Sequence, residues 1–365
     1  MRHTWSKISL IFFGATALLV ILGIAVITTA SIPLSQSNHG ESFYYFRHQI
    51  IYGLGLGLAA FLVLLNLKMA WIKKLGLPIL ILSIILLAAI FIPGFAYEAG
   101  GAKRWLNIFG ISFQPSELAK LALAIYFAHW LESKKDKIAK PVMILPFILW
   151  LGLVGSLVVM EPDFGTFLII CALALAIYFG AGAPLKPLLV AGVIGFLISI
   201  SLIAIEPYRR ERILSFLDPN RDATGSSYQL NQALIAIGSG GFTGLGLGKG
   251  IQKYNYLPET IGDSVFAIIS EEMGFIGASL ALFVYLIWIL SGLKIASTAA
   301  RPFEKYLVLG IVTWIGSQTF INILGILGLI PFTGIPLPFI SYGGTALTIE
   351  LAAVGIVANI ARKRT

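Results

Sequence analysis

The sequence has few charged residues and a single cysteine. Charged side chains make up 12% of its 365 residues, whereas hydrophobic side chains make up 58%, and the mean hydropathy is +0.90. Soluble domains carry about 25% charged residues, so this composition excludes a soluble domain and indicates a multi-spanning membrane protein. The lone Cys171 excludes a disulfide framework and a thiolate metal site. The four histidines lack the spacing of metal ligands and are assigned no role.

A nucleotide-binding motif is also absent, although residues 238–250 are dense in glycine. No Gly-x-Gly-x-x-Gly or Walker pattern fits, because Gly250 stands where a Ser or Thr would have to follow Lys249. We interpret the run as re-entrant structure with close backbone approach, since glycine is tolerated where backbone is buried or lines a cavity. Its amides and Lys249 could still bind a pyrophosphate.

Apolar stretches long enough to cross a bilayer as helices recur about ten times. The sequence therefore predicts an all-α, polytopic membrane helical bundle that forms a single domain over residues 1–365. The first stretch exceeds the length of a signal-peptide core, so we expect it to be retained. The predicted spans are 8–31, 46–66, 72–92, 115–131, 142–160, 164–182, 184–205, 264–292, 304–330 and 344–360, with one large extracytoplasmic loop, 206–262, between the seventh and eighth.

The distribution of Lys and Arg in short loops predicts the orientation. With the N-terminus inside, sixteen of these residues face the cytoplasm and three face outward, apart from the long loop. The sixteen are Arg2, Lys7, Lys68, Lys73, Lys74, Lys134, Lys135, Lys137, Lys140, Lys186, Lys294, Arg301, Lys305, Arg362, Lys363 and Arg364; the three are Arg47, Lys103 and Arg104. We expect both termini to be cytoplasmic. Topology and anionic lipid explain the net charge of +9, so no nucleic-acid partner is needed.

Asp263 stands where the long loop enters the eighth predicted span. An ionisable group at that depth is a functional-site hypothesis by default. Asp is also common as the N-cap of a helix, so capping is the plainer interpretation, and both roles can coexist.

Other polar or helix-breaking residues interrupt the apolar pattern. Glu117 and Lys120 lie three apart on one helix face and can neutralise each other, which favours a structural pair over a chemical one. Acidic residues also occur at Glu161 and Asp163 in a short outward loop, and inside predicted spans at Glu271, Glu272 and Glu350. Three prolines and the run 341–345 break the chain before the last helix, and interrupted helices of this kind often line a substrate site.

The closing segment carries a long and specific motif: Asn322, five residues, Gly328 to Ile335, then Phe339 to Ala346. It resembles the signature of the SEDS family (shape, elongation, division and sporulation), which is the FtsW, RodA and SpoVE group. Similar blocks occur in family order at 114–120, 161–166, 208–219 and 228–274, so the resemblance covers nearly the whole chain. Residues 228–232, 251–253 and 256–259 look more like the division branch, FtsW. One departure is the run Ile261-Gly262-Asp263-Ser264, where the family usually has His-Thr-Asp-Phe.

The resemblance implies a peptidoglycan glycosyltransferase of the bacterial cytoplasmic membrane that polymerises lipid II. It also implies a class B penicillin-binding protein as partner, together with other division or elongation proteins. Joining two lipid-linked sugars requires a carboxylate base, and inversion at the reacting carbon needs no enzyme nucleophile. Cations must stabilise the departing pyrophosphate, either basic side chains or a divalent Mg or Mn ion as cofactor.

The candidate site residues fall into four groups. They are Asp263 as catalytic base; Arg209, Arg210, Arg212, Lys249, Lys253, Glu259, Ser341, Gly343 and Gly344 for substrate; Glu117 and Lys120 as a structural or cavity pair; and Glu161, Asp163, Glu271 and Glu272 as further candidates. The arginines near 210 could instead be headgroup anchors. A flippase for the lipid-linked precursor is the alternative function, and an inactive division scaffold is a weaker one. A transporter's determinants cluster near the midplane, whereas the strongest candidates here face outward.

Overall fold

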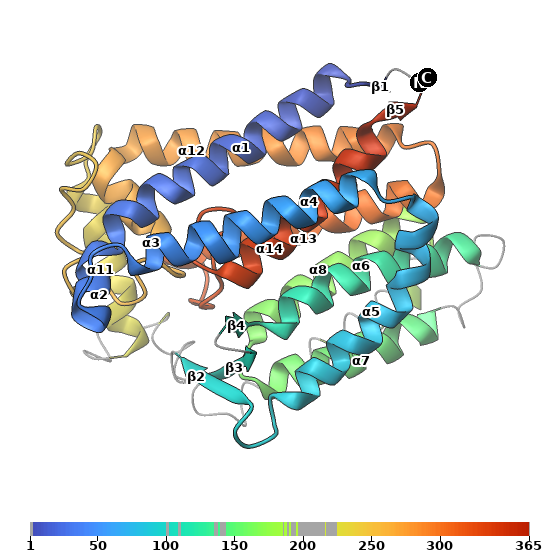
Figure 1. Cartoon of the computed structure of the whole chain (residues 1–365), viewed down its shortest axis with the longest axis horizontal. Helices are drawn as coiled ribbons and strands as arrows, with labels where there is room; N and C mark the ends of the chain where they lie inside the picture. The colour runs from blue at the N-terminus through green and yellow to red at the C-terminus, as the bar shows by residue number, and fades with distance from the viewer. Residues whose placement is uncertain are drawn as a thin grey trace.

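The protein is described by a computed structural model that covers residues 3–99, 102–108, 111–134, 138, 144–184, 186, 187, 190, 195, 216 and 225–364. Long helices dominate these residues and run roughly along one direction (Figure 1). The principal helices are α1 (Lys7–Ala30), α4 (Leu56–Asn66), α5 (Met69–Ala89), α6 (Pro115–Ser133), α7 (Leu145–Met160), α8 (Phe164–Gly180), α11 (Ser226–Ser239), α12 (Val265–Thr298), α13 (Pro302–Ile326) and α14 (Gly344–Ala361). The predicted all-α bundle is therefore confirmed.

Short elements complete the described chain. The helices α2 (Ile32–His39) and α3 (Tyr44–His48) lead into a π-helical turn, η1 (Gln49–Gly55), which continues directly into α4. Strands β2 (Ala96–Ala99), β3 (Ala102–Ile108) and β4 (Ile111–Phe113) form an antiparallel meander that the sequence analysis did not predict. Near the two ends of the chain, β1 (His3–Thr4) pairs with β5 (Lys363–Arg364).

Within the described residues, six helical segments are long and apolar enough to cross a membrane. They include α1, α5, α12, α13, α14 and the continuous run Tyr44–Asn66, while α7 and α8 are apolar but shorter. Leu77, Ile81 and Ile85 of α5 are exposed, as expected of side chains that face lipid. The chain is thus an integral membrane protein. The predicted seventh span, 184–205, lies mostly outside the described residues.

Small residues allow α4 and α14 to pack closely. A Cβ atom added to Gly355 would lie 2.7 Å from the carbonyl oxygen of Phe61, and one added to Gly57 would lie 2.6 Å from the Leu351 side chain. Close backbone approach of this kind is the usual way in which helices associate in lipid, where the hydrophobic effect between helices is absent. Asn359 adds hydrogen bonds from its Nδ2 to the carbonyls of Leu64 and Leu67, at 2.8 and 2.6 Å.

Helix α12 is broken at Gly274, which has φ 66° and ψ −169°. Its 34 residues would extend about 51 Å at 1.5 Å per residue, whereas the hydrocarbon core is about 30 Å thick. The part after the break is long enough to cross the hydrocarbon core alone. The amides of Phe275 and Ile276 donate instead to the carbonyls of Gly241 and Phe242, at 2.9 and 3.2 Å. The break therefore seats the glycine-rich segment 238–253 against α12.

The two ends of the bundle differ. The N- and C-termini lie together at one end, whereas α2, α11 and the first residues of α12 lie at the other (Figure 1). Thr345, at the start of α14, links the β-meander to this second end by donating its hydroxyl to the carbonyl of Ser112 at 3.0 Å. The site described next is at the end away from the termini.

Candidate active site

Asp263 follows a tight turn that precedes α12. The amides of Gly262 and Ser264 both donate to the carbonyl of Glu259, at 3.0 and 3.2 Å, and Glu259 adopts a left-handed φ of 50°. The N-cap of α12 is Ser264, so the interpretation of Asp263 as N-cap is wrong. The half-buried Asp263 carboxylate instead accepts hydrogen bonds through Oδ1 from Gln229 Nε2 at 3.2 Å and from the Ser264 hydroxyl at 3.4 Å.

The closing motif fixes the backbone of this turn through Asn322 of α13 and through segment 331–346, which we call the motif segment. Asn322 Nδ2 donates to the carbonyl of Asp263 at 2.8 Å and to that of Ile335 at 2.7 Å. The Ser341 hydroxyl donates to the carbonyl of Gly262 at 2.6 Å, and the amide of Tyr342 donates to that of Ile261 at 2.7 Å. Residues far apart in sequence thus hold the Asp263 main chain, and Gln229 of α11 orients its side chain.

The structure gives Ser341 a role different from the predicted substrate contact. Its hydroxyl also accepts the amide of Leu337 at 2.8 Å, and the side chain is buried, so the hydroxyl joins its own loop to the turn at Gly262. Phe339 in the same loop has a strained φ of 64°, and its amide donates to the buried Glu350 carboxylate at 2.7 Å. Strain at a non-glycine residue persists only where surrounding contacts impose it.

Two residues of η1 and α3 support the same loop, and the sequence analysis gave them no role. Gln49 accepts the Gly343 amide through Oε1 at 3.0 Å and donates to the Ser341 carbonyl at 3.4 Å. His48 Nδ1 and the Tyr342 hydroxyl are 3.0 Å apart. Gly343 and Gly344 were predicted to contact substrate. The Gly343 amide donates to Gln49 instead, and Gly344 is the first residue of α14. The π-helical turn, a feature that often marks functional sites, could not be recognised from apolar periodicity.

Glu271 and Glu272 of α12 accept hydrogen bonds from backbone amides of the glycine-rich segment. The amides of Ile251 and Gln252 donate to Glu271 Oε1 at 2.8 and 3.2 Å, and the amide of Gly248 donates to Glu272 Oε2 at 2.9 Å. Successive backbone amides of this kind make a concave anion site. The protein's own carboxylates occupy these three amides, so the prediction that the amides bind a pyrophosphate is not supported at Gly248, Ile251 and Gln252.

Lys253 completes this arrangement, which we call the carboxylate clasp: Glu271, Glu272, Lys253 and the amides of segment 248–252. Lys253 Nζ lies 2.7 Å from Glu272 Oε1, and the two side chains are 2% and 1% exposed. Nζ also donates to the carbonyl of Gly248 at 2.6 Å. The prediction that Lys253 binds substrate does not fit this burial, because its ammonium group is enclosed by protein acceptors.

Segment 238–253 confirms the predicted close backbone approach. A Cβ atom on Gly240 would lie 2.0 Å from the Ser270 carbonyl oxygen, and one on Gly244 would lie 2.2 Å from that of Glu272. Lys249 is exposed, so it stays available as a candidate cation. The other predicted cations, Arg209, Arg210 and Arg212, lie outside the described residues.

The predicted pair of Glu117 and Lys120 is present on α6 and is buried inside the bundle. Lys120 Nζ lies 2.7 Å from Glu117 Oε1, with side chains 1% and 2% exposed, and also donates to Gln318 Oε1 at 2.7 Å. Gln318 in turn accepts from Trp314 Nε1 at 3.0 Å and donates to the carbonyl of Pro336 at 3.0 Å. The pair thus connects α6 to α13 and to the motif segment.

The two acids between α7 and α8 have different environments. Asp163 is the N-cap of α8: its carboxylate accepts the Thr166 amide at 3.0 Å and the Thr166 hydroxyl at 2.8 Å. Glu161 is buried, and neither carboxyl oxygen has a hydrogen-bond partner among the described residues. The pKa of the Glu161 carboxyl is raised to about 9, chiefly by burial and also by the nearby Asp163, with Arg104 opposing. Glu161 is therefore protonated at neutral pH.

Arg104 of β3 anchors the meander to this turn. Its guanidinium donates to the carbonyl of Glu161 at 3.2 Å and to that of Pro162 at 2.6 Å. In the described part of the chain, no three His, Cys, Asp or Glu side chains gather in a way that could hold a metal ion. Mg²⁺ sites with fewer protein ligands rely on substrate phosphates for the remainder.

Comparison with known proteins identifies the family. A family model for the cell cycle proteins FtsW, RodA and SpoVE matches residues 9–365. The chain belongs to this family. It is 36% identical to a probable peptidoglycan glycosyltransferase FtsW of Geobacter sulfurreducens over 94% of this chain and 92% of that one. It is 35% identical to stage V sporulation protein E of Bacillus subtilis, over 95% of each chain.

Solved structures of SEDS proteins share the fold. A chain in a structure described as a peptidoglycan synthase complex that coordinates polymerisation and crosslinking superposes with a TM-score of 0.78, at 27% identity over 96% of both chains. RodA of Thermus thermophilus superposes with a TM-score of 0.70, at 26% identity over 96% of this chain and 95% of that one. The polytopic SEDS fold and the resemblance drawn from the motifs are both confirmed.

Proposed function

We propose that this SEDS protein is a peptidoglycan glycosyltransferase that polymerises lipid II at the outer face of the bacterial cytoplasmic membrane. The observation that carries this proposal is the Asp263 carboxylate. It is half-buried, is held from the side by Gln229, and has its main chain tied to Asn322 of the family motif. The peptidoglycan glycosyltransferase name of the FtsW relative supports the same activity.

The proposed reaction uses Asp263 as general base. A sugar hydroxyl of one lipid-linked disaccharide attacks the anomeric carbon of another, and its proton passes to the Asp263 carboxylate. The bond from that carbon to the pyrophosphate breaks, and polyprenyl pyrophosphate leaves with the bonding electron pair. A single displacement inverts the anomeric centre, so no covalent enzyme intermediate is needed.

The departing pyrophosphate needs positive charge or hydrogen-bond donors. Lys249 is the described cation that stays exposed near the glycine-rich segment, and we assign it to this task in place of Lys253. Arg209, Arg210 and Arg212 keep the same proposed role. A divalent Mg or Mn ion would have to be held mainly by the pyrophosphate itself, with few protein ligands.

The partner that we propose is a class B penicillin-binding protein, the transpeptidase that crosslinks the new strand. The support is the match to a chain from a synthase complex that combines polymerisation with crosslinking. Both termini are proposed to be cytoplasmic, from the sixteen-to-three distribution of Lys and Arg. Further division or elongation proteins belong to the same proposal.

A flippase is the alternative function. It draws support from the broken helix α12 and the buried ion pair of Glu117 and Lys120 within the bundle. The deciding experiment gives labelled lipid II to the purified protein together with its transpeptidase, and in parallel to the protein in sealed vesicles. Glycan ladders support the transferase. Translocation across the vesicle membrane without polymer would overturn it in favour of the flippase.

A further inference from the structure

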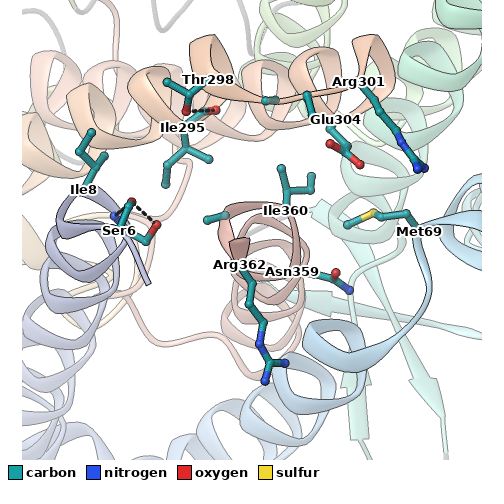
Figure 2. A pocket seen from close by; sticks show the side chains of 14 residues that line it. Ser6, Ile8, Met69, Ile295, Thr298, Arg301, Glu304, Asn359, Ile360 and Arg362 are labelled. Carbon is teal, nitrogen blue, oxygen red and sulfur yellow. Dashed lines mark hydrogen bonds between the residues drawn. The ribbon is translucent and has the colours of Figure 1, made fainter. Parts of the chain in front are cut away.

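A pocket of about 430 Å³ lies where α1 and α13 begin and α12 and α14 end (Figure 2). This is the end of the bundle that holds the termini, opposite the end where α12, which follows Asp263, begins (Figure 1). These four helices are each long enough to cross a membrane, so their common end lies at the level of a membrane surface. The volume falls within the range of small-molecule sites, about 300 to 1,000 Å³. Nothing in the proposed transfer reaction uses this pocket.

Two opposite charges line the pocket without pairing. Arg301 directly precedes α13, and Glu304 lies in the first turn of that helix. Both side chains point toward Met69 (Figure 2). Among the described residues, neither side chain takes part in a salt bridge. Arg362, another lining residue, points away from them, and its guanidinium donates to Asn66 Oδ1 at 3.3 Å. A guanidinium and a carboxylate are therefore both available to a ligand.

The remaining wall is part apolar and part polar, and its polar side chains, Ser6, Ser9, Thr298 and Asn359, already hydrogen-bond within the protein. Ile8 of α1, Ile295 of α12 and Ile360 of α14 line the pocket from three sides (Figure 2). A ligand that fits must present a cation and an anion near the start of α13, and apolar atoms toward these isoleucines. A phospholipid at the membrane surface has this distribution, whereas a soluble dianion or a purely apolar molecule does not.

We propose that this pocket binds the headgroup of a zwitterionic amine phospholipid, of which phosphatidylethanolamine is the type. The lipid phosphate accepts hydrogen bonds from the Arg301 guanidinium, whose planar fork suits phosphate oxygens. The lipid ammonium group binds the Glu304 carboxylate. Glu304 is the one acid among the described lining residues, and it disfavours headgroups that carry only negative charge.

The test uses native mass spectrometry of the purified full-length protein with phosphatidylethanolamine and phosphatidylglycerol supplied at equal concentration. We expect the parent protein to retain more phosphatidylethanolamine. Arg301→Gln should weaken the binding of both lipids by about tenfold, because a hydrogen bond to a charged group is lost. Glu304→Gln should weaken phosphatidylethanolamine alone and abolish the preference. Lys305→Gln is the matched control, since it removes an exposed charge from the same helix turn outside the pocket lining.

A second variant and a soluble probe make the result decisive. Ala299→Trp fills the pocket from the α12–α13 connection and should displace lipid while the melting temperature is retained. Phosphoethanolamine lacks the acyl chains and should bind at least tenfold more weakly than the lipid. Equal lipid retention by the parent and Arg301→Gln, a preference of the parent for phosphatidylglycerol, or equal affinity for phosphoethanolamine would each overturn the proposal. The readout is binding, so it does not depend on glycosyl transfer.

Discussion

Replacing Lys253 by Met tests whether the carboxylate clasp is structural. The change removes an ammonium group that lies 2.7 Å from Glu272 Oε1 and donates to the Gly248 carbonyl at 2.6 Å. Among the described residues, Glu272 then keeps the Gly248 amide at 2.9 Å and the Thr29 hydroxyl at 3.2 Å as partners. Stranding one charge of a buried pair costs about 3 to 5 kcal/mol, so we expect the free energy of unfolding to fall by that amount.

The assay measures thermal unfolding in detergent beside lipid II polymerisation. Lys253→Met should lose stability and polymerisation together, because segment 238–253 leads into the turn that carries Asp263. Adding Glu272→Gln should recover part of the loss, since no buried charge is then unpaired. Lys249→Met is the matched control: this exposed lysine should change stability by no more than about 0.5 kcal/mol. A Lys253→Met protein that melts like the parent yet makes no polymer would refute the structural role and return Lys253 to the substrate site.

Three further predictions concern the other acids and the second buried pair. Lys120→Met should lower folded yield and activity together, with partial recovery when Glu117→Gln is added; normal folding with no activity would place Lys120 in the site. Asp163→Ala should destabilise the protein by about 1 kcal/mol through loss of the α8 N-cap, whereas Asp163→Asn should not; equal melting of the two would exclude capping as its role. Because the folded-state pKa of Glu161 is raised from 4.5 to about 9, its burial costs stability as pH rises between these values. The free energy of unfolding of Glu161→Gln should therefore rise relative to that of the parent as pH increases, by at most about 1.4 kcal/mol per pH unit. A difference between the two unfolding free energies that does not change with pH would contradict the assigned pKa.

The sequence predicted the spanning helices well because apolar length is a direct physical requirement in lipid. The start of α6 at Pro115, the start of α8 after Asp163 and the boundaries of α14 all lie within two residues of the predicted limits. The buried pair of Glu117 and Lys120 was also predictable, since two charges one helical turn apart in an apolar helix have few other partners.

The elements missed by the sequence analysis lack such a local signal. The helix α11 lies in the long loop and leads into a glycine-dense run. Its apolar face is short, with Leu230, Ala233 and Ala236 recurring every third residue. The β-meander is short, and its strands are stabilised by pairing with one another. These contacts depend on neighbours in space, which composition does not reveal.

The roles of the polar residues were predicted less well than their importance. Glu271 and Glu272 were recognised as unusual inside a span, but their partners lie about twenty residues earlier, in Gly248 and in Ile251 to Lys253. The glycine-rich segment was predicted to offer its amides to a pyrophosphate, whereas three of them donate to Glu271 and Glu272. Asn322 and Ser341 belong to the motif because they fix the Asp263 turn, a function that appears only when distant segments fold together.

The most direct test of the central claim is lipid II polymerisation by purified Asp263→Asn with its transpeptidase, run beside a thermal-stability measurement. Asn keeps the size of the side chain and an oxygen that can accept from Gln229, but it cannot take up the proton of the attacking hydroxyl. We expect unchanged melting and partner binding, with polymerisation reduced by at least about 100-fold. Near-parental polymer from a stably folded Asp263→Asn protein would contradict the account and direct attention to Glu161, Asp163 and Glu259.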